Sequence, residues 1–321
     1  MATVLVTGAT GFVGSFAVPA FLAAGHTVVG LVRSAASGDT LKATLAPEVQ
    51  SRFSARVGDV TQPETLPGAL AGVDAVYHLV AIPRDFNGGR DLHRINTEGT
   101  RAMVDAATAA GVRRFIHQGA LGVAEDPKLH YSDSKAQGER IVRESGLDWT
   151  VFRPSLLWGV GDGFFSLIAT LVRMSPGVIP VPGDGNARFQ PLWAGDLVRC
   201  AVVSLEQPYT IGQACDLGGP AYWTYREITR EVLDALGKQR RIVPMPVPLI
   251  SLVARSSEVV HLPFPVASDQ LRQLKFDNIG PLDGVSRAFG FEPRPMNGHL
   301  GYLRHGGKGK AAAPPPERGP D

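Results

Sequence analysis

The sequence has little cysteine and almost no charge imbalance. Only two cysteines, Cys200 and Cys215, occur among 321 residues. Neither belongs to a CxxC or Cys/His spacing, so we expect neither a disulfide framework nor a zinc or other metal site, and both thiols should be buried. The formal net charge is +2, and no Lys/Arg run carries interleaved aromatics, which argues against a nucleic-acid partner.

The sequence also lacks a long hydrophobic run, and we expect no leader segment. The longest apolar run, FFSLIATLV, is followed by Arg173 and falls well short of the roughly 20 residues that a membrane-spanning helix needs. The N-terminus leads directly into an apolar, β-branched run, without the basic segment and cleavage site of a signal peptide. We therefore expect no integral membrane segment and a cytoplasmic location.

Up to about residue 153 the sequence alternates short β-branched runs with helical stretches. The strand candidates are TVLVT, TVVGLVR, SARVGDV, AVYHLV, RRFIHQ and WTVFR. Gly111 and Gly146 follow two of the helical stretches, where left-handed C-terminal caps are expected. The alternation predicts an α/β fold: a Rossmann-type, doubly wound parallel sheet with helices on both faces.

The pattern changes beyond Pro220. TYRE, Thr224 to Glu227, is a capping box that opens a helix ended by Gly237, and the stretch after it is punctuated by proline. We predict a Rossmann domain over residues 1–218 and a smaller, mostly helical C-terminal lobe over residues 219–304. Residues 305–321 are rich in Gly, Pro and Lys and lack apolar anchors, which predicts a disordered tail.

The first turn of the chain carries three glycines at the spacing GxxGxxG, within TGATGFVG. Gly8 would permit a tight turn, Gly11 would let backbone N–H groups approach a pyrophosphate, and Gly14 would let the helix lie close to the strand. The helix N-terminus would then face the phosphates. A glycine-rich turn without a ligand is the alternative, but the strand before it and the helix after it favour dinucleotide binding.

The end of the second strand distinguishes two dinucleotides. It reads LVRS, with Arg33 and Ser34, and the next carboxylate is Asp39. An arginine suits the 2′-phosphate of NADP, whereas an acidic residue would hold the ribose hydroxyls of NAD. We therefore predict NADP as the cofactor, with NAD as the alternative. For Arg33 the alternative is a solvated surface side chain without a cofactor contact. Asp59, after the third strand, should accept a hydrogen bond from the adenine or else cap a turn.

Tyr131 and Lys135 lie four residues apart in YSDSKAQGER and share one face of a predicted helix. A lysine ammonium beside a phenol favours the phenolate, which predicts a lowered pKa and an acid/base role for Tyr131. The same lysine is suited to hold the nicotinamide ribose. A half-buried tyrosine beside a surface lysine is the alternative interpretation.

Several motifs together resemble the extended and atypical branches of the short-chain dehydrogenase/reductase superfamily over about residues 3 to 210. They are TGATGFVG, DV after the third strand, HLVA, INTEGT, YSDSK and RPSLLWG. FRPSLLWGVGD, FQPLWAGDLVRC and SDQLRQLKFDN further resemble proteins similar to the nucleotide-binding accessory subunit of respiratory complex I. The resemblance implies that Tyr131 and Lys135 are catalytic. It implies cofactor contacts for Thr7, Gly8, Thr10, Gly11, Phe12, Gly14, Arg33, Ser34, Asp59, Val60, Leu79, Val80, Ala81, Asn96, Lys135 and Pro154.

One position departs from the family pattern. Active members carry a Ser or Thr just after the fifth strand that hydrogen-bonds the substrate carbonyl, but FIHQGALG has Gln118, Gly119 and Ala120 there. Losing one such donor typically costs about 10² to 10³ in rate. Gln118 and Ser155 are the candidates for a replacement hydrogen bond. His78 and His117 are expected to be packed strand histidines rather than acid/base groups.

Two functions remain open. The first is an NADP(H)-dependent oxidoreductase or isomerase for a small carbonyl or hydroxyl substrate, with Tyr131 exchanging the proton and Lys135 tuning it. The second is a non-catalytic NADP-binding accessory, scaffold or redox-sensing protein. The stretch PLISLVARSSEVVHL is suited to a peripheral membrane surface, a protein partner or burial in its own lobe. The intact Tyr/Lys pair favours the enzyme.

Overall fold

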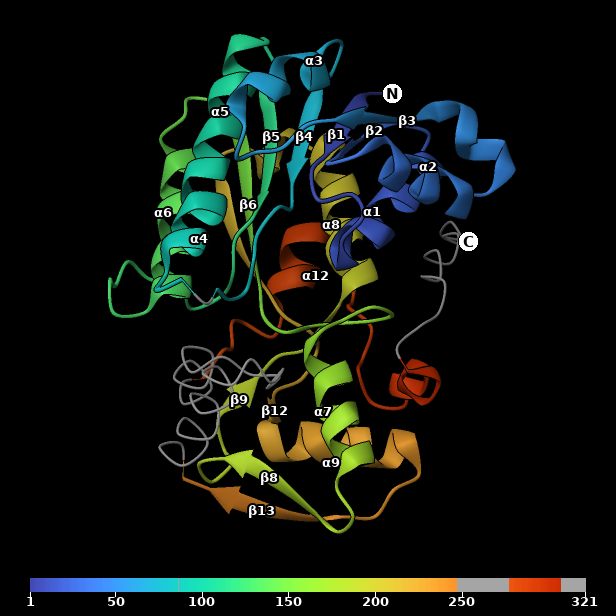
Figure 1. The fold of residues 1–321 in the computed structure, drawn as a ribbon, viewed down its shortest axis with the longest axis vertical. Helices are drawn as coiled ribbons and strands as arrows, with labels where there is room; N and C mark the ends of the chain where they lie inside the picture. The colour runs from blue at the N-terminus through green and yellow to red at the C-terminus, as the bar shows by residue number, and fades with distance from the viewer. Residues whose placement is uncertain (86, 247–276, 307–321) are drawn as a thin grey trace.

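The computed structural model describes residues 1–85, 87–246 and 277–306. Its upper part is a sheet of seven parallel strands in the order β11-β6-β5-β4-β1-β2-β3 (Figure 1). This confirms the predicted Rossmann-type sheet. The strands are β1 (Thr3–Val6), β2 (Thr27–Val32), β3 (Phe53–Val57), β4 (Ala75–His78), β5 (Arg114–Gln118), β6 (Asp148–Pro154) and β11 (Gln213–Leu217).

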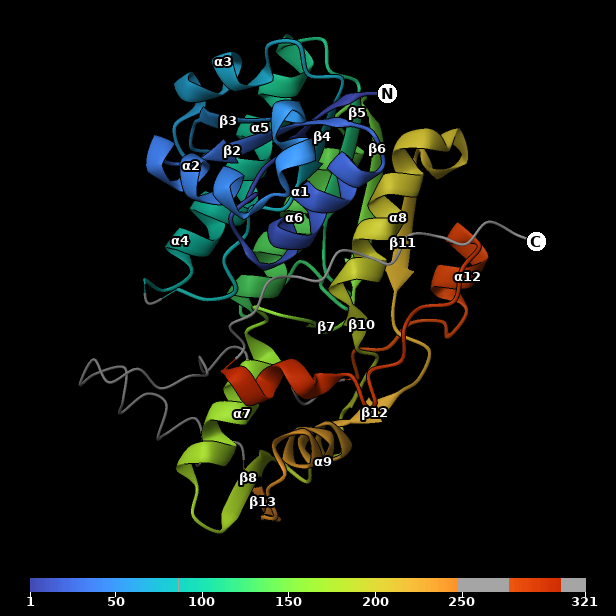
Figure 2. The same ribbon diagram turned by 90° about the vertical axis from the view of Figure 1, so that its right-hand side faces the viewer.

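Helices cover both faces of the sheet because successive strand side chains point to opposite sides (Figures 1 and 2). Val4 and Val6 pack on one side with α1 (Phe12–Ala23) and α8 (Ala194–Glu206), and Leu41 of α2 (Ala35–Thr44) belongs to the same core. Leu5 packs on the other side. That side is covered by α3 (Leu66–Leu70), α5 (Gly99–Ala109) and α6 (His130–Arg143).

Several predicted helix ends are present. Gly111 and Gly146 have φ of 73° and 70°, the left-handed conformation expected just after α5 and α6. A short helix, α4 (Arg90–Leu92), runs into η3 (His93–Glu98), a π-helical turn at the start of α5. Single 3₁₀ turns occupy η1 (Pro47–Arg52), η2 (Pro63–Thr65) and η4 (Pro208–Thr210).

The seventh strand, β11, has no counterpart among the strand candidates of the sequence. Its sequence, QACDL, shows no clear alternation, and it pairs with β6 at the edge of the sheet. Hydrogen bonding to β6 therefore creates a strand where local propensity does not indicate one.

The lower part of Figure 1 combines helices with short strand pairs. α7 (Phe164–Met174) packs on α9 (Tyr225–Leu236), and β8 (Val178–Pro182) pairs in parallel with β13 (Arg241–Met245). β9 (Arg188–Phe189) pairs with β12 (Trp223–Thr224). The Thr224/Glu227 capping box opens α9, and Gly237 ends it at φ 61°, as predicted.

Chain segments cross between the two parts. β7 (Leu157–Trp158) pairs with β10 (Leu192–Trp193) between them, and α12 (Gly284–Phe289) returns to pack on β11. η5 (Leu300–His305) packs on α9. The boundary at residue 218 stays a prediction, although α7 and β8 precede it and lie in the lower part, while α12 follows it and lies on the sheet.

Two predictions concern residues outside those described: the PLISLVARSSEVVHL stretch lies within 247–276, and most of the expected tail lies within 307–321. Among the described residues, no helix is long and apolar enough to cross a membrane. The same residues contain no group of three or more His, Cys, Asp or Glu side chains placed to hold a metal ion.

Candidate cofactor and catalytic site

The glycine turn lies between β1 and α1. Gly8 has φ of 63°, a conformation that glycine adopts without strain, and the N–H of Gly11 donates to its carbonyl at 2.9 Å. A Cβ on Gly14 would lie 2.3 Å from that same carbonyl oxygen, so only glycine fits there. Gly11 provides no side-chain cap for α1. The turn therefore leaves backbone N–H groups at the helix start, which suits a pyrophosphate.

Thr7 joins this turn to the segment after β4. Its Oγ1 accepts hydrogen bonds from the N–H groups of Leu79 at 2.9 Å and Val80 at 3.3 Å. A Cβ on Gly8 would lie 3.5 Å from Leu79, so the two loops are in contact. Seven of the predicted cofactor residues belong to these two loops: Thr7, Gly8, Thr10, Gly11, Leu79, Val80 and Ala81.

Arg33 and Ser34 lie where β2 ends and α2 begins. Both side chains are exposed. Ser34 is the N-cap of α2, since its hydroxyl accepts from the N–H of Ser37 at 3.3 Å and lies 2.9 Å from the Ser37 hydroxyl. Asp39 sits one turn into α2 and is exposed. The end of β2 thus presents a guanidinium and two hydroxyls, a donor set that suits a phosphate.

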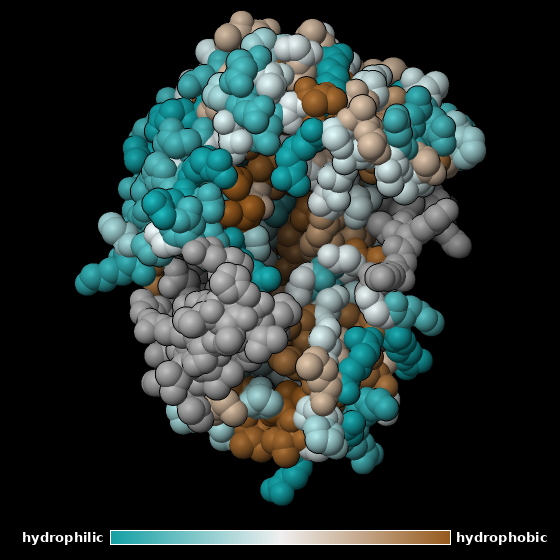
Figure 3. All heavy atoms as spheres, in the orientation of Figure 1, coloured by the Kyte–Doolittle hydropathy of each residue, from teal (hydrophilic) through white to brown (hydrophobic). Residues whose placement is uncertain are grey.

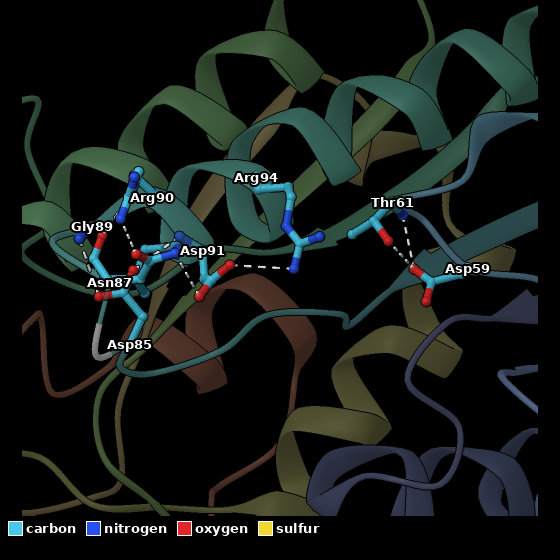
Figure 4. A network of polar contacts seen from close by, with 9 residues as sticks. Asp59, Thr61, Asp85, Asn87, Gly89, Arg90, Asp91 and Arg94 are labelled. Carbon is cyan, nitrogen blue, oxygen red and sulfur yellow. Dashed lines mark hydrogen bonds and ion pairs between the residues drawn. The ribbon is translucent and has the colours of Figure 1, made fainter.

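Asp59 forms a turn after β3, as Figure 4 shows. Its Oδ1 accepts from both the N–H and the hydroxyl of Thr61 at 2.8 Å. Asp59 therefore stabilises a turn, which was one of the two roles that the sequence left open. A hydrogen bond between its other carboxylate oxygen and adenine stays a prediction. The adjacent Val60 is buried and packs against Gly99 at the start of α5. A Cβ on Gly99 would lie 2.8 Å from Cγ2 of Val60.

Asn96, in the π-helical turn η3, holds the segment after β4 in place. Its Oδ1 accepts from the N–H of Ile82 at 2.8 Å, and its Nδ2 donates to the Ile82 carbonyl and to Ser134 Oγ, each at 3.1 Å. Asn96 is 2% exposed. Both amide protons are used within the protein, so the residue positions the loop, and a direct cofactor contact stays a prediction.

Tyr131 and Lys135 lie on α6 as predicted, but the lysine has a different partner. Its Nζ donates to the backbone carbonyl of Gln118, at the end of β5, over 2.6 Å. Burial, partly offset by Glu139, lowers the pKa of Lys135 to about 8. Burial raises the pKa of Tyr131 to about 12. The prediction that the lysine lowers the tyrosine pKa is wrong for this structure, because the ammonium is bonded to Gln118 and desolvation dominates at the phenol.

His78 and His117 stack on neighbouring strands, with ring centroids 5.6 Å apart and planes 18° from parallel. His78 lies 3.0 Å from the Thr7 hydroxyl and 3.2 Å from that of Thr100. Burial, together with the nearby Lys135 ammonium, lowers the pKa of His78 to about 3 and that of His117 well below its usual value. Both rings are therefore neutral at neutral pH and packed in the sheet.

The position after β5 carries no hydroxyl, and Ser155 does not replace it. The Ser155 hydroxyl donates to Asn278 at 2.7–2.8 Å and accepts from the N–H of Gln190 at 3.1 Å. Ser155 is 7% exposed and its hydroxyl is already bonded within the protein, so this geometry does not support it as the replacement donor. Gln118 has a buried side-chain Oε1 without a hydrogen-bond partner among the described residues, but an amide oxygen only accepts, so a donor role toward a substrate carbonyl falls to its Nε2 and stays a prediction.

Pro154 ends β6 beside this position. It is buried, and its carbonyl accepts from the N–H of Leu121 at 3.0 Å. Its predicted place near the nicotinamide stays a prediction.

Sequence reasoning missed an ion pair between the buried Glu139 of α6 and Arg153 of β6. Glu139 is 5% exposed, and its two carboxylate oxygens accept from Nε of Arg153 at 3.1 and 3.0 Å. Arg153 also lies 3.5 Å from Asp216 of β11. The available sequence signal is that Lys135, Glu139 and Arg143 follow one another at intervals of four residues, on the same face of α6, and Arg143 lies 3.7 Å from Glu139.

A second feature that sequence reasoning missed is the loop after β4. Asp85 accepts hydrogen bonds from the N–H groups of Gly89 at 3.1 Å and Asp91 at 2.9 Å, which fixes the start of α4 (Figure 4). Gly89 in turn lies against His130, the first residue of α6. The loop is thereby held beside the helix that carries Tyr131.

A family model described as NAD(P)H-binding matches residues 8–161. This part of the chain, just under half of its length, is similar to the NAD(P)H-binding family. The matched span runs from the first glycine of the turn, through Tyr131 and Lys135, to the loop after β7. The resemblance to atypical short-chain dehydrogenases/reductases is thereby confirmed at the level of the family.

Relatives of this NAD(P)H-binding chain fall into more than one functional group. It is 26% identical to NADH dehydrogenase (ubiquinone) 1 alpha subcomplex subunit 9, mitochondrial, of Arabidopsis thaliana, over 84% of this chain and 67% of that protein. It is 29% identical to NAD(P)H azoreductase of Xenophilus azovorans, over 75% and 76%. The structure of triphenylmethane reductase from Citrobacter sp. matches with a TM-score of 0.75 at 20% identity, covering 94% and 99%, a likeness of fold.

Proposed function

We propose that this chain is an NADP(H)-dependent oxidoreductase that acts on a small carbonyl or hydroxyl substrate. The observation that carries the proposal is that the glycine turn and the Tyr131/Lys135 pair lie at the same edge of the sheet. Thr7 bonds to Leu79 after β4, and Lys135 bonds to Gln118 at the end of the neighbouring β5. Ligands of open α/β sheets bind outside the carboxyl ends of the strands.

The residues present fit a dinucleotide. The glycine turn would hold the pyrophosphate, since its shape depends on close backbone packing in which a Cβ on Gly14 would collide with Gly8 and Ala9. Arg33 and Ser34 would take the 2′-phosphate, which favours NADP over NAD. When bound in reduced form, such a cofactor supplies hydride to a substrate.

The protein's own residues favour the reductive direction. A phenol with a pKa of about 12 keeps its proton at neutral pH, so Tyr131 is suited to donate a proton to a substrate oxygen. Figure 3 shows a hollow between the upper and lower parts with largely hydrophobic residues in its floor. Such a surface supports a small, mostly apolar substrate.

A non-catalytic accessory or redox-sensing protein is the second candidate. Ala120 stands where active relatives place a hydroxyl, and the Ser155 hydroxyl is already bonded to Asn278. The similarity to a subunit of NADH dehydrogenase also supports this alternative. In that case the dinucleotide would stabilise the fold or report on redox state.

Calorimetric titration with NADPH and NADH tests the cofactor half of the proposal. We expect tighter binding of NADPH, and loss of binding in Gly14→Ala, whose added Cβ would lie 2.3 Å from a backbone oxygen. The control is Gly68→Ala, because a Cβ there meets nothing within 4 Å. Absence of NADPH binding by the wild-type protein would contradict the proposal.

A screen of carbonyl substrates with NADPH tests the catalytic half. Tyr131→Phe removes the phenolic proton and keeps the ring, so we expect it to lower kcat strongly while leaving the Kd for NADPH unchanged. A reductase activity that survives this substitution would remove Tyr131 from the mechanism. NADPH binding without activity toward any substrate would favour the accessory role.

A further inference from the structure

The loop after β7 lies directly against the first residue of α1. Gly159 and Gly161 have φ of 146° and 93°. A Cβ on Gly159 would lie 2.9 Å from Phe16 and 3.6 Å from Phe12, and one on Gly161 would lie 3.7 Å from Phe12. The Phe12 and Phe16 rings pack edge to face, with centroids 5.7 Å apart. Since Phe12 directly follows Gly11, this loop forms a wall beside the glycine turn.

The Tyr302 hydroxyl bonds both ends of that loop, and the ends are also joined to each other because the N–H of Asp162 donates to the Gly159 carbonyl at 3.0 Å. Tyr302 Oη donates to Asp162 Oδ2 at 2.5 Å and accepts from the N–H of Gly159 at 3.3 Å. Asp162 is 4% exposed, and its other oxygen accepts from the N–H groups of Phe165 at 2.7 Å and Ser166 at 3.2 Å. The carboxylate therefore caps α7 and bonds Tyr302 at the same time.

Tyr302 belongs to η5, which is docked independently of this hydroxyl. Arg304 Nε donates to the carbonyl of Ala235 in α9 at 2.6 Å, and Arg173 of α7 donates to the carbonyl of Leu303. Leu300 and Leu303 are each 1% exposed. Loss of the Tyr302 hydroxyl should therefore detach the loop from η5. The loop would keep its own bond between Asp162 and Gly159, and η5 would stay attached to the lower part.

We propose that Tyr302 is a positioning residue for the dinucleotide site, and that dinucleotide binding and the docking of η5 stabilise each other. This rests on the proposed function, because it requires a dinucleotide at the glycine turn. When the loop is detached from Tyr302, it confines Phe12 less firmly. Dinucleotide binding must then also order the start of α1, and this cost weakens the affinity for the dinucleotide. Coupling between two events is reciprocal, so the dinucleotide in turn stabilises η5.

Tyr302→Phe removes only the hydroxyl. We expect the Kd for NADPH, measured by calorimetry, to rise about fivefold to tenfold, at the low end of typical coupling between two sites. The matched control is Tyr209→Phe, since the Tyr209 hydroxyl donates to the carbonyl of Ala288 at 3.1 Å, beside β11. Its Kd should stay within about twofold of the wild-type value.

Hydrogen exchange gives a second measurement that does not depend on activity. NADPH should slow exchange of the amides of residues 300–305 in the wild-type protein and in Tyr209→Phe, and have no such effect in Tyr302→Phe. Asp162→Asn keeps a side chain that caps helices well but loses the charged acceptor of the Tyr302 hydroxyl, and should behave like Tyr302→Phe.

The outcomes separate this inference from the proposed function. A wild-type protein that does not bind NADPH overturns the proposed function itself. If the wild-type protein binds NADPH and Tyr302→Phe binds it equally well, with only a lower Tm, the hydroxyl serves stability alone and the inference is wrong. Exchange of residues 300–305 that is unchanged by NADPH would also overturn it.

Discussion

The ammonium of Lys135 lies 2.6 Å from the backbone carbonyl of Gln118. This bond attaches α6 to the end of β5. Two residues farther along the chain is Ala120, where active relatives carry a hydroxyl. The bond also explains why Tyr131 has a raised pKa, since the lysine charge is committed elsewhere and burial alone acts on the phenol. The phenol of Tyr131 therefore keeps its proton at neutral pH.

The buried lysine predicts a pH-dependent stability. Burial lowers the pKa of Lys135 from 10.5 to about 8, so between these two values the unfolded chain binds more protons than the folded one. The contribution of Lys135 to the free energy of unfolding therefore rises as the pH increases from about 8 to 10.5. Below pH 8 the burial of Lys135 destabilises the folded protein by its full amount, up to about 3 kcal/mol.

Urea unfolding of the wild-type protein and Lys135→Met across this range checks the prediction. The stability advantage of the methionine variant should shrink as pH rises from 8 to 10.5. Lys42→Met, at an exposed site on α2, is the control and should show no such trend. A pH-independent difference between Lys135→Met and the wild-type protein would contradict the assigned cause.

Arg33 should control the choice of dinucleotide. Arg33→Ser removes the guanidinium next to the Ser34 and Ser37 hydroxyls, so we expect the Kd for NADPH to rise about tenfold or more and the Kd for NADH to stay unchanged. Arg101→Ser, which alters only an exposed pair with Glu98, is the control. Equal effects on both dinucleotides would show that Arg33 does not recognise the 2′-phosphate.

A hydroxyl after β5 should increase catalysis. Ala120 is half-buried, and Ala120→Ser adds the donor that active relatives carry, so kcat for a carbonyl substrate should rise by up to about 10²-fold. The Kd for NADPH should not change, and Ala110→Ser, at the exposed end of α5, should be neutral. A rate that is unaffected by Ala120→Ser would indicate that Gln118 or another group already serves the substrate, or that the site is not catalytic.

The Glu139–Arg153 pair should be important for stability. Arg153→Met leaves the Glu139 carboxylate buried without its bidentate partner, so we expect a loss of about 3 to 5 kcal/mol in the free energy of unfolding. Arg113→Ala, which breaks the exposed pair with Asp148, should cost much less, because solvent screens an exposed ion pair. The two losses are compared by urea unfolding, and equal values would contradict the importance of burial.

The sequence by itself determined the features that depend on short spacings. The alternation of β-branched runs with helical stretches predicted six of the sheet strands, and the Thr224/Glu227 capping box and Gly237 predicted the limits of α9. The glycine turn was predictable for the same reason. Its three glycines serve a local backbone geometry that residues within one turn impose on each other.

Only the tertiary structure decided which groups the site can use. Lys135 bonds to Gln118 rather than polarising Tyr131, and the Ser155 hydroxyl is taken by Asn278, a residue 123 positions away. β11 becomes a strand because β6 offers it hydrogen bonds. Such partners depend on strand order and on where loops cross the sheet, because a hydrogen bond between distant segments leaves no periodicity in the chain.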